Sequence, residues 1–395
     1  MQKAGHRIPI GILFSTLGPY GTIGRELRDG ALLGLDMANA RADGAFRLEP
    51  CVVDPGGSLD RYRAAADHLL TNGVRHIVGC YTSSSRKEII PSLEKFDGLL
   101  WYPSHYEGFE SSPNVIYTGA APNQHVVPLA NWALPRYGGR TYCIGSNYIW
   151  AWENTRIMRD LVQSGGGTIL RERYLPIGST DVRAAIREIS ESAPDFVFNT
   201  LIGESCYAFY RAYHELAQHD ERFLPTKRPI LSCSLSEPEL HAIGPGVAAG
   251  HIAASVYFQS ITSMENVAFV RTFRERFGGN RVTSADSEAA YMTMLLLAAS
   301  LHEAKTDQLG PVKQAAYACR LSAPQGDMWV DPENNHAWLT PRIGTVTAEG
   351  SFEIQWEAST PYRPDPYLAF SPKAAAVANG MPRRGGPQLR LVRCQ

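Results

Sequence analysis

Several familiar signatures are missing from this 395-residue sequence, and each absence excludes a class of function. Lysine and arginine total 38 against 39 aspartate and glutamate residues, and no long block of one sign occurs. This balance argues against direct binding of nucleic acid, which requires a basic surface. No stretch reaches the ~18 uninterrupted apolar residues of a membrane-spanning helix. We therefore expect no membrane insertion.

Metal and cofactor motifs are equally scarce. The seven cysteines are odd in number and none has a C-x-x-C spacing, which predicts buried thiols in a reducing compartment. His76, His105 and His125 lie on different expected elements without an i, i+4 pair, so we interpret them as structural histidines. The G-x-G-x-x-G and Walker A motifs of nucleotide sites are also lacking. We therefore expect neither a metal nor a cofactor.

The signatures of a hydrolase are incomplete. A nucleophile elbow requires G-x-S-x-G, and the nearest string, residues 203–207, lacks the closing glycine. An amidase of the Glu-Lys-Cys type could use Glu204 and Cys206, but nothing in the pattern identifies the lysine. We therefore expect a binding protein rather than an enzyme, and we keep an amidase as the weakest of three hypotheses.

The N-terminal residues do not have the form of a secretory leader. They contain no apolar core followed by a small-residue cleavage site, and residues 8–14 fit a buried strand better. This pattern predicts a cytoplasmic protein, or a periplasmic one if a leader has been removed from the chain.

What the sequence does contain is a repeated alternation of short β-branched runs with longer segments of helical period. This alternation is typical of parallel sheets covered by helices on both faces. The expected strands form two sets, residues 8–14, 46–54, 74–79 and 99–102, and then residues 141–145, 168–174, 196–201 and 229–232. The pattern predicts an α/β fold of two doubly wound, parallel-sheet lobes.

The length of the chain also favours two lobes, because 395 residues exceed what one hydrophobic core usually supports. Residues 250–258 could cross back to the first lobe, so we expect about three crossings between the lobes. The first lobe is then residues 1–121 with 255–335, and the second is residues 122–254 with 336–369. Residues 370–395 are rich in Pro, Gly, Ala and Arg, which predicts a loosely held tail.

Hydroxyl and aromatic side chains follow two neighbouring strands of the first set. Tyr81, Thr82 and Ser83 come after residues 74–79, and Tyr102, Pro103 and Ser104 end the next strand. The carboxyl ends of parallel strands line the crevice in which ligands bind. Ser83 could cap the following helix or offer its hydroxyl to a ligand, and the residues alone favour neither role.

The second lobe has comparable residues at its own strand ends. Tyr148 and Trp150 follow the first of these strands, Glu204 follows the third, and Ser232 ends the fourth. These residues would face the first lobe across a cleft. A tryptophan at this position could equally fill the core.

Several strings of the sequence resemble one family nearly from end to end. They are residues 54–63, 79–87, 102–103, 106–110, 121–124, 323–326, 334–336 and 363–367. With these strings the chain resembles the AmiC-type amide sensors and the related urea and short-chain amide receptors of the branched-chain amino-acid-binding superfamily. The resemblance implies a type I periplasmic-binding-protein fold with its ligand between the lobes.

The resemblance also implies roles for individual residues. It assigns Ser83 to the ligand carbonyl, with Tyr81, Tyr102, Pro103 and Ser104 around it. Two second-lobe residues depart from the family pattern, which has a tyrosine at Trp150 and a small uncharged residue at Glu204. A carboxylate at Glu204 would suit urea, formamide or a cationic amidine better than acetamide.

Two functions follow from the resemblance. The first is a sensor that binds a small amide or urea and negatively regulates an amidase-type operon through an AmiR-like antiterminator partner, with a homo-oligomer left open. The alternative is the solute-binding component of an ABC uptake system for urea or short-chain amides.

Overall fold

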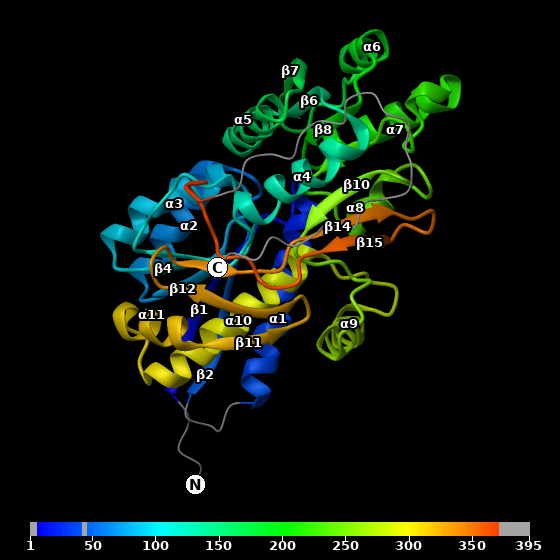
Figure 1. Ribbon diagram of the computed structural model, residues 1–395. Helices are drawn as coiled ribbons and strands as arrows, with labels where there is room; N and C mark the ends of the chain where they lie inside the picture. The colour runs from blue at the N-terminus through cyan, green and yellow to red at the C-terminus, as the bar shows by residue number, and fades with distance from the viewer. Residues whose placement is uncertain (1–5, 42–45, 371–395) are drawn as a thin grey trace, which may run out of the picture.

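The computed structural model describes residues 6–41 and 46–370. The predicted tail, residues 370–395, lies outside these residues except for Phe370. Within the described chain the strands form two sheets, and each sheet is the centre of one lobe (Figure 1). This arrangement confirms the predicted α/β fold with two lobes.

The first sheet has the strand order β11-β12-β13-β5-β4-β3-β1-β2. Its strands are β1 (His6–Leu13), β2 (Phe46–Val53), β3 (His76–Gly79), β4 (Leu99–Tyr102), β5 (Val115–Tyr117), β11 (Arg320–Ala323), β12 (Gly326–Asp331) and β13 (His336–Trp338). The helices of this lobe are α1 (Gly21–Arg41), α2 (Leu59–Thr71), α3 (Ser83–Lys95), α9 (Met264–Phe277), α10 (Ala285–Ala304) and α11 (Leu309–Ala318). The pairs from β2 through β13 are parallel, whereas β12 and β11 are added antiparallel.

The second sheet has the order β15-β14-β10-β9-β8-β6-β7. Its strands are β6 (Arg140–Ser146), β7 (Thr168–Leu175), β8 (Phe196–Thr200), β9 (Ile230–Ser232), β10 (Ile252–Ser255), β14 (Arg342–Val346) and β15 (Phe352–Glu357). Its helices are α4 (Val126–Tyr137), α5 (Ile149–Ser164), α6 (Arg183–Ser192), α7 (Glu204–His219) and α8 (Glu237–Ile243), with short 3₁₀ turns η1 (Pro122–Gln124) and η2 (Glu221–Phe223).

The chain passes between the lobes after β5, after β10 and after β13, as the prediction of about three crossings requires. The predicted division at residues 335 and 336 is corrected, because β13 pairs with β5 and β12 in the first sheet. The third crossing therefore follows Trp338. The remaining boundaries of the predicted lobes stay a proposal.

Close packing of α1 against α10 fixes one face of the first lobe. A Cβ atom on Gly30 would lie 2.1 Å from the backbone oxygen of Ser287 on α10, so only glycine allows this approach. Helix α10 begins after Ser284, whose hydroxyl accepts a hydrogen bond from the backbone N–H of Ser287 at 3.2 Å. The start of α10, including the buried Asp286, is held firmly by these contacts.

Candidate binding site between the lobes

The two lobes touch at the carboxyl ends of their strands. The backbone N–H of Glu204, at the start of α7, donates to the carbonyl oxygen of Pro19 in the loop before α1, at 3.3 Å. Tyr81 of the first lobe and Tyr148 and Trp150 of the second belong to one continuous buried cluster. The lobes are therefore closed on each other, at the edge where the sequence predicts the site.

Aromatic rings line the closed cleft. Tyr81 is 5% exposed, and its ring centroid lies 5.5 Å from that of Tyr20. From the second lobe, Tyr148 stacks on Trp150 at 6.2 Å, and Trp150 makes an edge contact of 5.2 Å with His105 of the first lobe. The Nε1–H of Trp150 is buried and has no hydrogen-bond partner among the described residues. Because an unsatisfied buried donor is costly, this N–H is the strongest candidate for a ligand contact.

Ser83 does not cap its helix. Thr82 is the N-cap of α3, and its hydroxyl accepts a hydrogen bond from the backbone N–H of Ser85 at 3.2 Å. The buried Ser83 hydroxyl instead donates to a carboxylate oxygen of Glu107. The capping role considered for Ser83 is therefore wrong, because the helix begins one residue earlier than such a cap requires. Its contact with a ligand stays a prediction.

The carboxylate bonded to Ser83 is in turn held by a buried arginine. Arg86 on α3 is fully buried and pairs with Glu107 at 3.1 Å and with Glu110 at 2.7 Å. Its guanidinium carbon lies 4.6 Å from the ring centroid of Tyr102. Burial alone would raise the pKa of Glu110, but the charge of Arg86 lowers it to about 2. This network fixes the first-lobe wall of the cleft.

Other predicted site residues use their hydroxyls within the protein. Tyr102 donates to the backbone carbonyl of Tyr81 at 2.8 Å, and Ser104 donates to a backbone carbonyl at 3.3 Å. Ser232 accepts backbone N–H groups from the turn after β9, at 3.1 and 3.2 Å. Pro103 is buried between its neighbours. These residues shape the cleft, and their contact with a ligand stays a prediction.

Glu204 lies at the edge of the cleft, but its side chain is exposed. Gly203 precedes it with φ 57° and ψ −136°, and this turn presents the backbone N–H of Glu204 to Pro19. In this closed structure the Glu204 side chain is therefore not enclosed by the cleft, and its contact with a ligand stays a prediction.

Four buried carboxylates beside the cleft are not among the site residues predicted from the sequence. Glu237 and Glu239 lie in the first turn of α8, whereas Glu26 on α1 and Asp286 on α10 come from the first lobe. Each is at most 6% exposed. Burial raises the pKa of Glu237 and Glu239 to about 8 and the pKa of Glu26 and Asp286 to about 7. The cleft therefore carries protonated acids near neutral pH.

These carboxylates adjoin the aromatic wall. Burial, and then the charges of Tyr148, Asp286 and Glu239, raise the pKa of Tyr81 well above its ordinary value. The guanidinium of Arg281 pairs with Glu26 at 2.7 Å and with Asp29 at 3.0 Å. The serine and glutamate at residues 236 and 239 have the spacing of a capping box, a sequence signal that could have predicted Glu239 in the first turn of a helix. The structure contains this box, in which the Glu239 carboxylate accepts a hydrogen bond from the backbone N–H of Ser236. The burial of Glu239 depends on contacts with the opposite lobe, and a local sequence pattern cannot predict such contacts.

We expect the closed structure to be less stable at about pH 8.5 than at about pH 7.5. The four carboxylates keep protons in the folded chain that they release on unfolding, so stability falls as the pH rises through their raised pKa values. Each group contributes up to about 1.4 kcal/mol per pH unit. Buried histidines such as His76, whose pKa burial lowers to about 4, are neutral in both states over this interval. Calorimetric melting temperatures measure the slope.

The contribution of one carboxylate can be separated from that of the other titrating groups. Glu239→Gln keeps an oxygen that can accept the Ser236 hydrogen bond but carries no titrating proton, so the slope should become shallower. Glu204→Gln, on the exposed start of α7, should leave the slope unchanged. A Glu239→Gln chain with the slope of the unmodified protein would contradict the assignment.

The cysteine needed by the amidase hypothesis is not reactive. Cys206 is 1% exposed, and the Asn199 side chain donates to its sulfur at 3.3 Å. Burial, and then the charge of Glu239, raise the pKa of the thiol well above its ordinary value. Because the thiolate is the nucleophile, this environment suppresses nucleophilic chemistry at Cys206.

No group of three or more His, Cys, Asp or Glu side chains in residues 6–41 and 46–370 could hold a metal ion. No helix in the same part of the chain is both long enough and apolar enough to cross a membrane.

Comparison with known proteins places these features in a family. A solute-binding protein of an ABC transporter from Rhodopseudomonas palustris HaA2, in complex with p-hydroxybenzoic acid, superimposes with a TM-score of 0.81 at 20% identity, covering 92% of this chain and 99% of that one. A leucine-binding protein from Thermotoga maritima MSB8 gives 0.78 at 15% identity, covering 89% and 98%. At these identities the likeness establishes the fold.

Sequence comparisons include a partial match to one curated protein and a nearly complete match to a family model. A protein named limonene hydroxylase from Geobacillus stearothermophilus is 30% identical over 127 residues, which are 32% of this chain and only 23% of that protein. The model of the periplasmic binding protein domain matches residues 8–373. The chain therefore belongs to the periplasmic binding protein domain family.

Proposed function

We propose that this protein is the solute-binding component of an uptake system for urea or short-chain amides, which it binds between its lobes. The family and the solved relatives named as transporter proteins support a receptor. They give no support to the predicted control of an amidase-type operon, to an AmiR-like partner or to a homo-oligomer. A receptor for uptake works outside the cytoplasmic membrane, so the proposal favours the periplasm over the predicted cytoplasm.

The buried Nε1–H of Trp150 is the observation that carries the ligand class. It is a hydrogen-bond donor without a partner, in a wall otherwise formed by aromatic rings. A carbonyl oxygen satisfies one such donor, and the adjoining carboxylates can accept the N–H groups of an amide or urea. A free donor beside several acceptors fits a small molecule with one C=O and one or two NH₂ groups.

The charges near the cleft disfavour the aromatic acids that some relatives bind. Arg86 is saturated by Glu107 and Glu110, and Arg281 is paired with Glu26. Among the described residues, no cation of this wall therefore remains to neutralise a ligand carboxylate, whose charge would be buried without a partner. A neutral ligand avoids this cost.

The small size of the ligand limits the affinity. At a ceiling of about 1.5 kcal/mol per non-hydrogen atom, the four such atoms of urea or acetamide supply at most about 6 kcal/mol. This free energy corresponds to a dissociation constant on the order of tens of micromolar. Titration calorimetry with formamide, acetamide, propionamide, urea, guanidinium and benzoate tests the proposal, and preferred binding of benzoate would contradict it.

Replacing Trp150 by phenylalanine should weaken binding of the preferred amide or urea by about tenfold, because one hydrogen bond in a buried site is lost. Trp152→Phe is a matched control on the same helix, since that indole is 45% exposed and donates to Asn147. The control should bind as the unmodified chain does. Equal affinities for all three chains in calorimetry would remove Trp150 from the site.

A further inference from the structure

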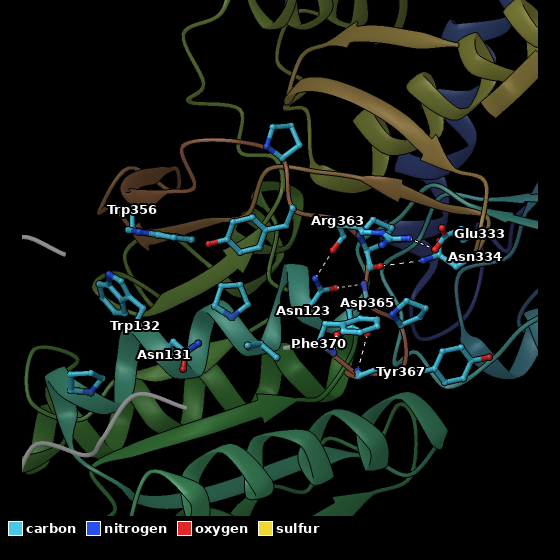
Figure 2. A pocket seen from close by; sticks show the side chains of 18 of the residues that line it. Asn123, Asn131, Trp132, Glu333, Asn334, Trp356, Arg363, Asp365, Tyr367 and Phe370 are labelled. Atoms are coloured by element: carbon cyan, nitrogen blue, oxygen red, sulfur yellow. Dashed lines mark hydrogen bonds and ion pairs between the residues drawn. The ribbon is translucent and has the colours of Figure 1, made fainter. Parts of the chain in front are cut away.

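A groove of about 1090 Å³ lies beside the first crossing between the lobes. Helix α4 and strand β15 supply Trp132 and Trp356 to one side, and the segment at residues 361–370 supplies the other (Figure 2). Glu333, in the turn between β12 and β13, also lines it. Prolines and aromatic rings dominate the lining.

The groove is bounded by both lobes. Helix α4 packs on β10 and β14 of the second sheet. The segment at residues 361–370 is anchored to the first lobe, where Arg363 pairs with Asp331 at 2.9 Å and the Asn334 side chain donates to the carbonyl of Pro364 at 3.1 Å. Whatever fills the groove therefore contacts both lobes.

Large apolar side chains stand exposed at the rim. Phe370 is 87% exposed, Tyr367 is 50% exposed and Tyr362 is 37% exposed. The Asp365 carboxylate accepts the backbone N–H groups of Ala369 and Phe370, at 2.9 and 2.8 Å, and this turn directs the chain along the groove. An apolar surface of this extent is typical of a contact site.

We propose that the groove is the docking site of the chain's own C-terminal segment, residues 371–395. The described chain ends at Phe370, which itself lines the groove, and 25 residues follow it. They include the apolar run Leu389-Arg390-Leu391-Val392 and three prolines. Their charged side chains are all basic, and the groove lining contains two acidic residues, Glu333 and Asp365, of which Glu333 pairs with Arg363. The apolar run is the anchor.

The tether makes even weak docking effective. Leu389 lies 19 residues beyond Phe370, a separation for which the random-coil span is about 25 Å on average. A tether of this kind gives an effective concentration on the order of 1 mM. A segment that binds with a dissociation constant near ~0.1 mM would thus occupy the groove most of the time.

A peptide of residues 371–395, with Cys394→Ser to prevent oxidation, tests the proposal against two chains. By calorimetry it should bind a chain that ends at Phe370 at least about tenfold more tightly than the full-length chain, whose groove is already occupied. A Leu391→Asp peptide should lose this binding, and a Leu391→Met peptide should retain it. Trp132→Ala in the shortened chain should abolish binding.

A second measurement does not depend on the stability of any groove variant. Leu391→Asp in the full-length chain changes none of the described residues, and it should speed amide hydrogen exchange in residues 126–137 as much as removal of residues 371–395 does. Three results would each overturn the proposal. The first is equal affinity of the peptide for the full-length and shortened chains, and the second is equal affinity of the Leu391→Asp and unmodified peptides for the shortened chain. The third is unchanged hydrogen exchange in residues 126–137 of the Leu391→Asp and shortened chains.

Discussion

A Gly203→Ala chain should fold with both lobes intact but fail to close, and its affinity for the preferred amide or urea should fall roughly 100-fold. Gly203 has φ 57° and ψ −136°, a conformation that alanine adopts only with strain. Its added Cβ would also lie 1.8 Å from the carbonyl oxygen of Pro19 in the other lobe. A backbone carbonyl cannot rotate away as a flexible side chain can. Either the lobes must separate at this contact, or α7 must shift.

The prediction is checked by small-angle scattering and calorimetry. The radius of gyration of Gly203→Ala should exceed that of the unmodified chain and should not contract when ligand is added. Gly166→Ala is the matched control, since Gly166 has φ 87° but nothing within 4 Å of an added Cβ. It shares a positive φ with Gly203 but lacks the clash. If both variants close alike, contact at Pro19 does not limit closure.

Replacing Arg86 by methionine should lower the free energy of unfolding by about 3–5 kcal/mol, the largest stability loss we expect from one side chain. The substitution leaves the carboxylates of Glu107 and Glu110 buried without their shared cation. It also releases Glu107, which holds the Ser83 hydroxyl, so ligand affinity should fall with stability. Thermal unfolding is the appropriate measurement, because urea and guanidinium are candidate ligands.

Two further variants separate charge from packing at this site. Arg183→Met removes an ion pair whose arginine is 88% exposed, and it should leave the melting temperature nearly unchanged. Adding Glu107→Gln to Arg86→Met should recover part of the lost stability, because one uncompensated charge is removed. No recovery in the double variant would mean that lost packing, rather than buried charge, explains the effect.

Periodicity in the sequence is sufficient to predict the two lobes and the strand ends that line the cleft. Both depend on local alternation of β-branched runs with helical segments, and Tyr81 and Trp150 follow such runs directly. The cap of α3 could not be settled in this way, because Thr82, Ser83 and Ser84 are all competent caps. Only the backbone geometry, with Thr82 in an extended conformation, decides among them.

Features that depend on both lobes at once are beyond local patterns. Glu239 becomes a buried acid only because the first lobe, with Asp286, closes over it. Glu204 has the same type of side chain and also begins a helix, yet it remains exposed. Position along the chain does not distinguish the two, since the difference arises from contacts between segments far apart in sequence.

The path of the chain also constrains how the protein is made. Strand β13 pairs with β5 through His336 and Tyr117, more than 200 residues apart. On the ribosome the whole parallel core of the second lobe, up to β10 at Ser255, emerges before this pairing can form. The edge of β5 must wait unpaired during that time, and an exposed strand edge invites aggregation. Translation speed across residues 118–335 should thus affect the yield of soluble protein more than the stability of the finished fold.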